Sequence, residues 1–147
     1  MRAAKHAIDL SKIQNQQEKQ EETTEVELIA LVVMDLTKLP DSFRATTSGY
    51  HGAMELEEKR KEAQQWLDKV RALAEEQNYD IGAFKSVIIE DISSRVGHAI
   101  VNYAESRSID LIVIGTRGRS GLKKMLLGSV ASDVVTYAHC PVLVIRA

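Results

Sequence analysis

Four aliphatic runs, separated by longer amphipathic and polar stretches, form the pattern of this chain. The runs are VELIALVVMD, SVIIED, DLIVIG and PVLVIR, at residues 26–35, 86–91, 110–115 and 141–146. Each run predicts a strand. The first is almost continuously aliphatic from Val26 to Met34, which is typical of a parallel strand that is covered on both faces.

Outside the four predicted strands, apolar residues recur at steps of three and four, which is the spacing of one helix face. In the first segment this face is expected to consist of Ala4, Ala7, Ile8 and Ile13. Residues 36–52 are rich in Pro, Gly, Ser and Thr and predict a long loop. The longest predicted helix follows at residues 53–77, and we expect Trp66 on the side of that helix that faces the core.

Two shorter helices are predicted after the second and third strands. Ser93 or Ser94 can cap the first of them, because a serine hydroxyl accepts a hydrogen bond from the first backbone N–H groups of a helix. The inward face of this helix is expected to be Val96, Ile100 and Ala104. Residues 129–138 fit the other helix.

The resulting order is one helix, three strand–helix units and a last strand. Alternating strands and helices predict an α/β fold, a Rossmann-like parallel sheet with helices on both faces. With 147 residues we expect one domain, residues 1–147. In such sheets ligands bind at the carboxyl ends of the strands.

The composition argues against several classes of protein function. The formal net charge of -2 argues against a surface that binds nucleic acid as a whole, and no apolar run is long enough to cross a membrane. Cys140 is the only cysteine, so the chain can form neither an intrachain disulfide nor a cysteine-based zinc site. The first residues, MRAAKHAIDLSK, do not read as a signal peptide, and we expect a cytoplasmic location.

The stretch IGTRGRSGLKKMLLGSVASD, at residues 114–133, is the strongest candidate for chemistry. Gly115 and Gly118 follow a strand, where the absence of side chains lets backbone N–H groups approach a ligand closely. Gly128 and Ser129 open the next helix, whose N-terminal amides favour an anion. Four basic side chains add a local positive field and favour a phosphate: Arg117, Arg119, Lys123 and Lys124.

The residues alone leave two interpretations of this stretch open. One is a phosphate cradle. The other is a turn in which the glycines only change the direction of the chain and Ser129 only caps a helix. The spacing matches neither the GxxxxGK[ST] phosphate loop nor the GxGxxG dinucleotide motif.

The glycine spacing resembles that of the universal stress protein family, whose ATP-binding members carry a G-x2-G-x9-G-[ST] pattern. Gly115, Gly118, Gly128 and Ser129 reproduce this pattern, and the similarity extends from Ser86 to the C-terminus. It is weaker over residues 1–35. The resemblance implies a module that binds ATP or a related adenine nucleotide, with or without Mg²⁺, in the stress response or in signalling.

The resemblance also implies roles for individual residues. The backbone of Gly115, Gly118, Gly128, Ser129 and Val130 would hold the triphosphate, and the Ser129 hydroxyl would add a contact. Ile114 would approach the ribose, and the backbone of Val33 would read the adenine edge. No nucleophile or general base is well placed, so we expect a binding protein rather than an enzyme, with slow ATP hydrolysis left open.

In one respect the chain departs from this family. Family members usually begin with a strand that ends in an Asp contacting the ribose, whereas MRAAKHAIDLSK already resembles the first helix. The missing strand lies in the middle of the family's sheet, so we expect a gap between the strands at residues 26–35 and 110–115. The favoured explanation is a misplaced start. A sheet that closes up directly and a strand supplied by another chain are the alternatives.

Family resemblance further implies a homodimer that pairs the last strands, PVLVIRA. Two rival functions remain open from the sequence. The first is a protein-interaction module that has the same fold and binds no nucleotide, because the ribose-contacting Asp is absent. The second is an ATPase or nucleotidyl transferase that uses the same glycine-rich stretch.

The remaining candidates have simpler explanations. The four histidines are scattered and predict no metal site. Glu90 and Asp91 are adjacent carboxylates that could bind magnesium or act as a base, but a strand exit followed by a charged helix start is the favoured interpretation. Asp35 has the same ambiguity. Cys140 is expected to be a small buried residue at the start of the last strand.

Overall fold

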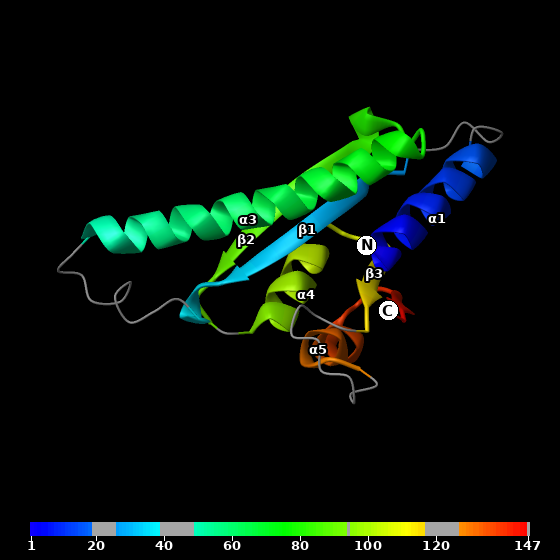
Figure 1. The fold of residues 1–147 in the computed structure, drawn as a ribbon. Coiled ribbons are helices and arrows are strands. Elements are labelled where there is room, and N and C mark those ends of the chain that lie inside the picture. The colour runs from blue at the N-terminus through cyan, green and yellow to red at the C-terminus, as the bar shows by residue number, and fades with distance from the viewer. Residues whose placement is uncertain (19–25, 39–48, 94, 117–126, 147) are drawn as a thin grey trace.

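The computed structural model describes residues 1–18, 26–38, 49–93, 95–116 and 127–146 (Figure 1). In chain order the elements are α1 (Arg2–Glu18), β1 (Leu28–Asp35), the 3₁₀ turn η1 (Leu36–Lys38), α3 (Gly49–Glu76), the 3₁₀ turn η2 (Ile81–Ala83), β2 (Phe84–Asp91), α4 (Val96–Ser106), β3 (Ile112–Gly115), α5 (Ser129–Tyr137) and β4 (Val142–Ile145). This order confirms the predicted succession of one helix, three strand–helix units and a last strand.

The strands form two separate parallel pairs. β1 pairs with β2 from Leu28 opposite Phe84 to Asp35 opposite Asp91. The shorter β3 pairs with β4, from Ile112 opposite Val142 onward. Parallel pairing is therefore confirmed, but within the described ranges no ladder joins β1 to β3. The alternative in which the sheet closes up directly is wrong for the described residues, and the expected gap lies between these two strands.

Helices cover both faces of the β1–β2 pair. Figure 1 shows the long helix α3 along one side of these strands and α4 on the other, and both helices contact both strands. α1 packs against β1 and α3 and also reaches β3 and β4, so this helix bridges the two strand pairs. The layered α/β architecture predicted from the sequence is confirmed.

Among the described residues the core consists of three apolar clusters. Ile8 of α1 packs with Ala74, Tyr79 and Phe84 beside the start of β1. The other two clusters are centred on Met34, Leu36 and Ala63, and on Val101, Ala104, Ile112 and Val134. Full burial of a side chain such as Ile8 stabilises the fold by about 1.5–3 kcal/mol. The last cluster holds α4 and α5 against β3.

The buried face of α1 differs from the prediction. Ile8 is fully buried, but Ile13 is 55% exposed. Five residues correspond to about 140° around a helix of 3.6 residues per turn, so Ile13 points away from the core. Ser11 takes the inward position and donates its hydroxyl to the carbonyl of Ile8 at 2.9 Å, which satisfies its polar group there.

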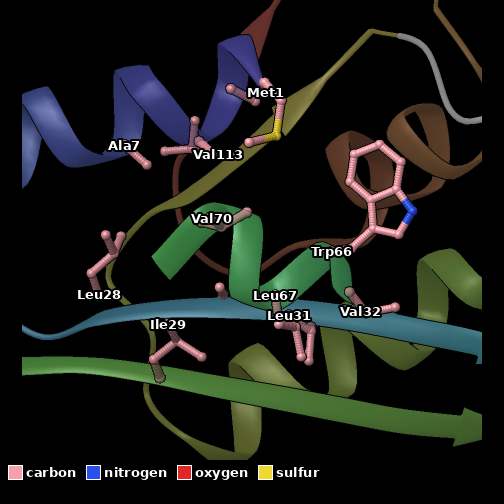
Figure 2. A pocket seen from close by; sticks show the side chains of 13 residues that line it. Met1, Ala7, Leu28, Ile29, Leu31, Val32, Trp66, Leu67, Val70 and Val113 are labelled. Atoms are coloured by element: carbon pink, nitrogen blue, oxygen red, sulfur yellow. The ribbon is translucent and has the colours of Figure 1, made fainter. Parts of the chain in front are cut away.

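Two other core expectations fail at the gap. Trp66 is 37% exposed instead of buried. On α4 the fully buried positions are Gly97, Val101 and Ala104, while Ile100 is only half-buried. Both Trp66 and Ile100 line cavities beside β1 and β3 (Figure 2 shows the one at Trp66), which accounts for their partial exposure. Cys140 is half-buried beside the third cluster, less deeply than expected.

Candidate functional site

Backbone hydrogen bonds bring the end of β3 and the start of α5 together. The N–H of Thr116 donates to the carbonyl of Ile145 at 2.9 Å, which continues the β3–β4 ladder by one step. The N–H of Gly128 then donates to the carbonyl of Thr116 at 2.9 Å. Gly115 and Gly128, which are distant in the sequence, therefore belong to one small region at the carboxyl end of β3.

The cap residue of α5 has no side chain. It is Gly128, in an extended conformation with φ -72° and ψ 158°, so the cap residue itself forms no side-chain hydrogen bond at this helix start. The first intrahelical bond runs from the N–H of Ser132 to the carbonyl of Gly128 at 2.9 Å. Because a helix leaves its first amides without intrahelical partners, the N–H groups of Ser129 and Val130 carry partial positive charge here.

Ser129 occupies the first helical position rather than the cap. The interpretation in which Ser129 only caps the helix is therefore wrong, since the cap is Gly128. The Ser129 residue is exposed, and Val130 is half-buried. An exposed hydroxyl beside the first amides of a helix is available to a bound anion.

Part of the predicted site lies outside the described residues. Gly118 and the basic residues Arg117, Arg119, Lys123 and Lys124 all fall within residues 117–126. Their predicted roles stay predictions. The two flanks of this segment, Gly115 with Thr116 and Gly128 with Ser129, are the parts of the motif that the structure brings together.

The predicted nucleoside contacts lie on different strand pairs. Val33 is opposite Ile89 in the β1–β2 pair. Ile114 is opposite Val144 in the β3–β4 pair. Both residues are half-buried and lie near the carboxyl ends of their strands. The gap between β1 and β3 therefore separates the residue expected near the adenine from the residue expected near the ribose.

The carboxyl ends of β1 and β2 carry two buried carboxylates in register. Asp35 accepts hydrogen bonds from the N–H and hydroxyl of Thr37 at 3.0 and 2.5 Å, and pairs with the Lys38 ammonium at 3.1 Å. Burial raises the pKa of Asp35, but the hydrogen bonds from Thr37 and the Lys38 charge outweigh burial and hold that pKa below its usual value. Asp35 is therefore charged and fully occupied by its own loop.

Asp91 organises the start of α4 in the same way. It accepts from the N–H of Ser93 at 3.0 Å, the hydroxyl of Ser93 at 2.6 Å and the N–H of Arg95 at 3.0 Å. The Ser93 hydroxyl is the largest influence and lowers the pKa of Asp91, whereas burial and the neighbouring Asp35 carboxylate oppose it without reversing the shift. The pKa of Asp91 therefore lies below its usual value.

These contacts correct the predicted helix cap. The N-cap of α4 is Arg95, whose own side chain forms no cap bond, and Ser94 lies outside the described residues. Asp91 supplies the negative charge at this helix start. Glu90 forms an ion pair with Arg60 at 2.7 Å. The structure thus agrees with the favoured interpretation of Glu90 and Asp91 as a strand exit and a charged helix start.

Clusters of metal ligands and membrane-spanning helices are both absent from the described part of the chain. Among its residues, no three or more His, Cys, Asp or Glu side chains gather in a way that could hold a metal ion. In the same part of the chain, no helix is both long and apolar enough to cross a membrane.

Thr116 was not among the predicted site residues. Its backbone joins β3, β4 and α5, and its position between Gly115 and Gly118 was the signal that could have identified it.

Parallel strand pairs covered by helices, with a glycine-capped helix at a strand's carboxyl end, define a Rossmann-like α/β protein. The model of the universal stress protein family matches residues 1–146. Universal stress protein MJ0531 of Methanocaldococcus jannaschii is 36% identical over 151 residues, covering 99% of this chain and 74% of that protein. This chain belongs to the universal stress protein family, which places its role in the stress response.

Solved structures support the same fold. Universal stress protein UspA from Lactobacillus plantarum has a TM-score of 0.75 at 23% identity, covering 98% of this chain and 87% of that chain. MJ0577 of Methanocaldococcus jannaschii has a TM-score of 0.63 at 27% identity, covering 92% of this chain and 87% of that chain. Both structures thus contain residues beyond those that this chain matches.

Proposed function

We propose that this universal stress protein binds ATP or a related adenine nucleotide, with the phosphates at the start of α5. The supporting observation is the hydrogen bond from Gly128 to Thr116, which joins the glycine-capped helix start to the end of β3. The glycine spacing shared with ATP-binding members of the family supports the same proposal.

The phosphate side of the proposed site consists mainly of backbone. A phosphate near Gly128 would meet the N–H groups of Ser129 and Val130 and the hydroxyl of Ser129. Gly115 and Gly118 would allow close approach from the strand side, because neither has a side chain. Each charge-assisted hydrogen bond contributes about 1.5–3 kcal/mol, so a few such contacts are enough for binding at millimolar or lower nucleotide concentrations.

On the nucleoside side we propose backbone contacts from Val33 and Ile114. Mg²⁺ would bind through the phosphates, since the metal usually keeps several waters and uses few protein ligands. The proposed role is binding that reports nucleotide state, without turnover. Single-turnover assays with ATP and magnesium test the slow-ATPase alternative directly, because hydrolysis there would appear as bound ADP.

The proposal includes a cytoplasmic homodimer. Among the described strands β4 pairs only with β3, and its residues Val142–Ile145 are half-buried. An unpaired strand edge of this kind favours association with a second copy. Sedimentation of the protein would show a dimer, and a Pro in place of Val144 would shift it to monomer by removing an N–H from the strand.

A charge at the first position of α5 tests the proposed site. Ser129→Asp places a carboxylate where the phosphates would lie, so ATP affinity should fall at least about tenfold. The fold should not suffer, because a negative charge stabilises a helix N-terminus by about 0.3–1 kcal/mol. The measurement is calorimetric titration with ATP, together with the melting temperature.

Asn102→Asp is the matched control, because this exposed α4 residue receives the same change of net charge. Its ATP affinity should stay within about twofold of the unchanged protein, since exposed charges more than a Debye length of about 10 Å away are largely screened. Equal ATP affinity in Ser129→Asp and the unchanged protein would show that phosphate does not bind at α5. An absence of ATP binding by the unchanged protein at millimolar concentration would favour the interaction module instead.

A further inference from the structure

One carboxylate on α5 lies just beyond the first turn of this helix. Asp133 is the only charged residue of α5, whose sequence is SVASDVVTY. It follows Ser129 by four residues, so the two side chains lie on the same face of the helix, about 6 Å apart along its axis. The Cα–Cβ bond of a helical residue tilts toward the N-terminus, which leans Asp133 toward Ser129. A phosphate at the start of α5 would have this carboxylate as its neighbour.

Contacts with α4 hold the Asp133 side chain in place. A Cβ at Gly97 would overlap the Cβ of Asp133 and lie 3.0 Å from its Oδ2, so this side chain lies directly against the backbone of α4. One turn further along α5, the Tyr137 ring packs on the His98 ring, with 4.7 Å between the ring centroids. The two contacts fix the face of α5 that carries Asp133 against the first turn of α4.

The Asp133 carboxylate has no hydrogen bond or ion pair with any described residue. The residue is half-buried. Asp35 and Asp91 differ, because both accept hydrogen bonds from the residues that follow their strands. Asp133 keeps both carboxylate oxygens free, and oxygen atoms of this kind are the ligands that Mg²⁺ prefers in proteins.

Charge decides which form of a nucleotide suits this arrangement. Two unit charges about 6 Å apart in bulk water repel enough to lower affinity about threefold, and the effect grows at a protein surface. A metal-free triphosphate would meet this repulsion from Asp133. A bound Mg²⁺ cancels part of the phosphate charge and attracts the carboxylate. Asp133 would therefore weaken the binding of metal-free nucleotide and strengthen the binding of its Mg²⁺ complex.

We propose that Asp133 makes the site at α5 selective for the Mg²⁺ complex of the nucleotide over the metal-free form. This selectivity rests on the proposed nucleotide site and deepens it, because it assigns a protein carboxylate to the metal. Mg²⁺ usually binds through one or two carboxylates together with substrate phosphates, and it keeps several waters. Asp133 is the carboxylate that α5 itself offers, one turn from Ser129.

A purely structural role for Asp133 predicts a different result. Its carboxylate lies beside the first turn of α4, where a negative charge stabilises a helix. With that role alone, Asp133→Asn would lower the melting temperature and leave the ratio of the two nucleotide affinities unchanged. The ratio of affinities is therefore the quantity to measure.

The experiment is calorimetric titration with ATP, once with an excess of MgCl₂ and once with EDTA, for the unchanged protein and for Asp133→Asn. The unchanged protein should bind the Mg²⁺ complex more tightly. Asp133→Asn keeps the size of the side chain and removes its charge, so both the repulsion of metal-free ATP and the attraction of Mg²⁺ are lost. The ratio of the two Kd values should fall at least about tenfold, about threefold from each loss.

Two further variants serve as controls. Asp110→Asn receives the same change of net charge at an exposed residue that precedes β3, at the opposite end of this strand from the site. Its ratio should stay within about twofold of the unchanged protein, because distant exposed charges are screened. Asp133→Glu restores a carboxylate and should recover the Mg²⁺ preference to within about threefold. Melting temperatures of all variants separate a loss of folding from a loss of selectivity.

The outcomes distinguish the role of Asp133 from the proposed function. A ratio that falls in Asp133→Asn alone and returns in Asp133→Glu supports the role. Equal ratios in the unchanged protein and Asp133→Asn, with ATP bound by both, would overturn the role and leave the proposed function intact. An equal fall in Asp110→Asn would overturn it too, since the effect would be one of net charge. An absence of ATP binding with and without Mg²⁺ would overturn both.

The unchanged protein allows a second measurement that needs no substitution. Mn²⁺ is a paramagnetic substitute for Mg²⁺, and when it is added with ATP it should broaden the NMR signals of Asp133 more than those of Asp110. Equal broadening of the two residues would contradict a metal held at Asp133.

Discussion

The starts of α4 and α5 differ in how each helix receives negative charge. α4 follows β2, and the carboxylate of Asp91 accepts its first N–H from Arg95 at 3.0 Å. The cap residue of α5 is Gly128, which has no side chain. Among the described residues, one helix start therefore has an internal anion, and the other has backbone amides only. The difference illustrates how one strand-to-helix connection of a fold can supply negative charge to the helix from within the chain, while another leaves that position open, as we propose for α5.

The same difference extends to the two strand pairs. The carboxyl edge of β1 and β2 carries two charged aspartates, Asp35 and Asp91, in register. The described carboxyl edge of β3 ends in Gly115 and Thr116, and its side chains carry no charge. The two carboxylates of the first edge would repel a phosphate, whereas no such repulsion arises from the described side chains of the second. This comparison is why we locate the phosphates at α5.

The largest expected effect comes from adding a side chain at Gly97, where α4 and α5 pack closely. A Cβ at Gly97 would overlap the Cβ of Asp133 and lie 3.0 Å from its Oδ2. Gly97→Val should therefore push α4 from α5 and lower the free energy of unfolding by about 3 kcal/mol or more, despite the loss of a helix glycine. Urea unfolding measures this loss, and Gly82→Ala in η2 is the control for glycine removal.

A stable Gly97→Val protein would contradict the close packing of these helices. Gly82 has only the flexible Asp80 carboxylate nearby, at 3.2 Å from an added Cβ, so Gly82→Ala should change stability far less. If both substitutions cost the same, the effect is one of glycine in general. In that case the contact between α4 and α5 would not fix the position of either helix, and their starts could not be compared as parts of one rigid arrangement.

The next effect tests whether Asp91 is the internal anion of α4. Asp91→Ala removes the carboxylate that accepts from the N–H groups of Ser93 and Arg95 and should cost about 0.5–2 kcal/mol, the usual cost of losing an acceptor at a helix start. Asp110→Ala is the control, because this exposed aspartate precedes β3 and should change stability by less than about 0.5 kcal/mol. Thermal unfolding of both variants should separate them clearly, and equal losses would contradict the role of Asp91.

A smaller, pH-dependent effect follows from the lowered pKa values of Asp35 and Asp91. A carboxylate with a lowered folded-state pKa contributes its stability above the unfolded pKa and loses that contribution as the pH falls through the folded pKa. The advantage of the unchanged protein over Asp91→Asn should therefore be constant above about pH 5 and shrink below the ordinary value of 3.8. A difference that stays constant down to pH 2.5 would show that the charge of Asp91 does not matter.

Local patterns predicted most of the fold. The aliphatic runs identified all four strands, and the glycine spacing located the region where Gly115 and Gly128 meet. The sequence pattern failed where a distant neighbour decides the outcome. Trp66 is 37% exposed because it lines a cavity beside β1, where the helical period alone predicts a core position.

For the candidate site, the sequence predicted the location of the residues better than their individual roles. Gly128 and Ser129 lie at the predicted helix start, but which of them is the cap depends on backbone torsion angles rather than on residue type. Asp91 was predicted as the negative charge at the start of α4, but the cap residue, Arg95 rather than Ser93 or Ser94, could not be read from residue type. Roles for Gly118 and the basic residues stay predictions.

One titration tests the central claim that α5 takes the external anion. Backbone amide shifts of the unchanged protein are followed by NMR as ATP is added, and the two helix starts are compared. The claim predicts saturable shifts at Gly115, Gly128, Ser129 and Val130, with little change at Ser93 and Arg95. Shifts concentrated at the start of α4, or no saturable shift at Gly128 and Ser129 at millimolar ATP, would contradict it.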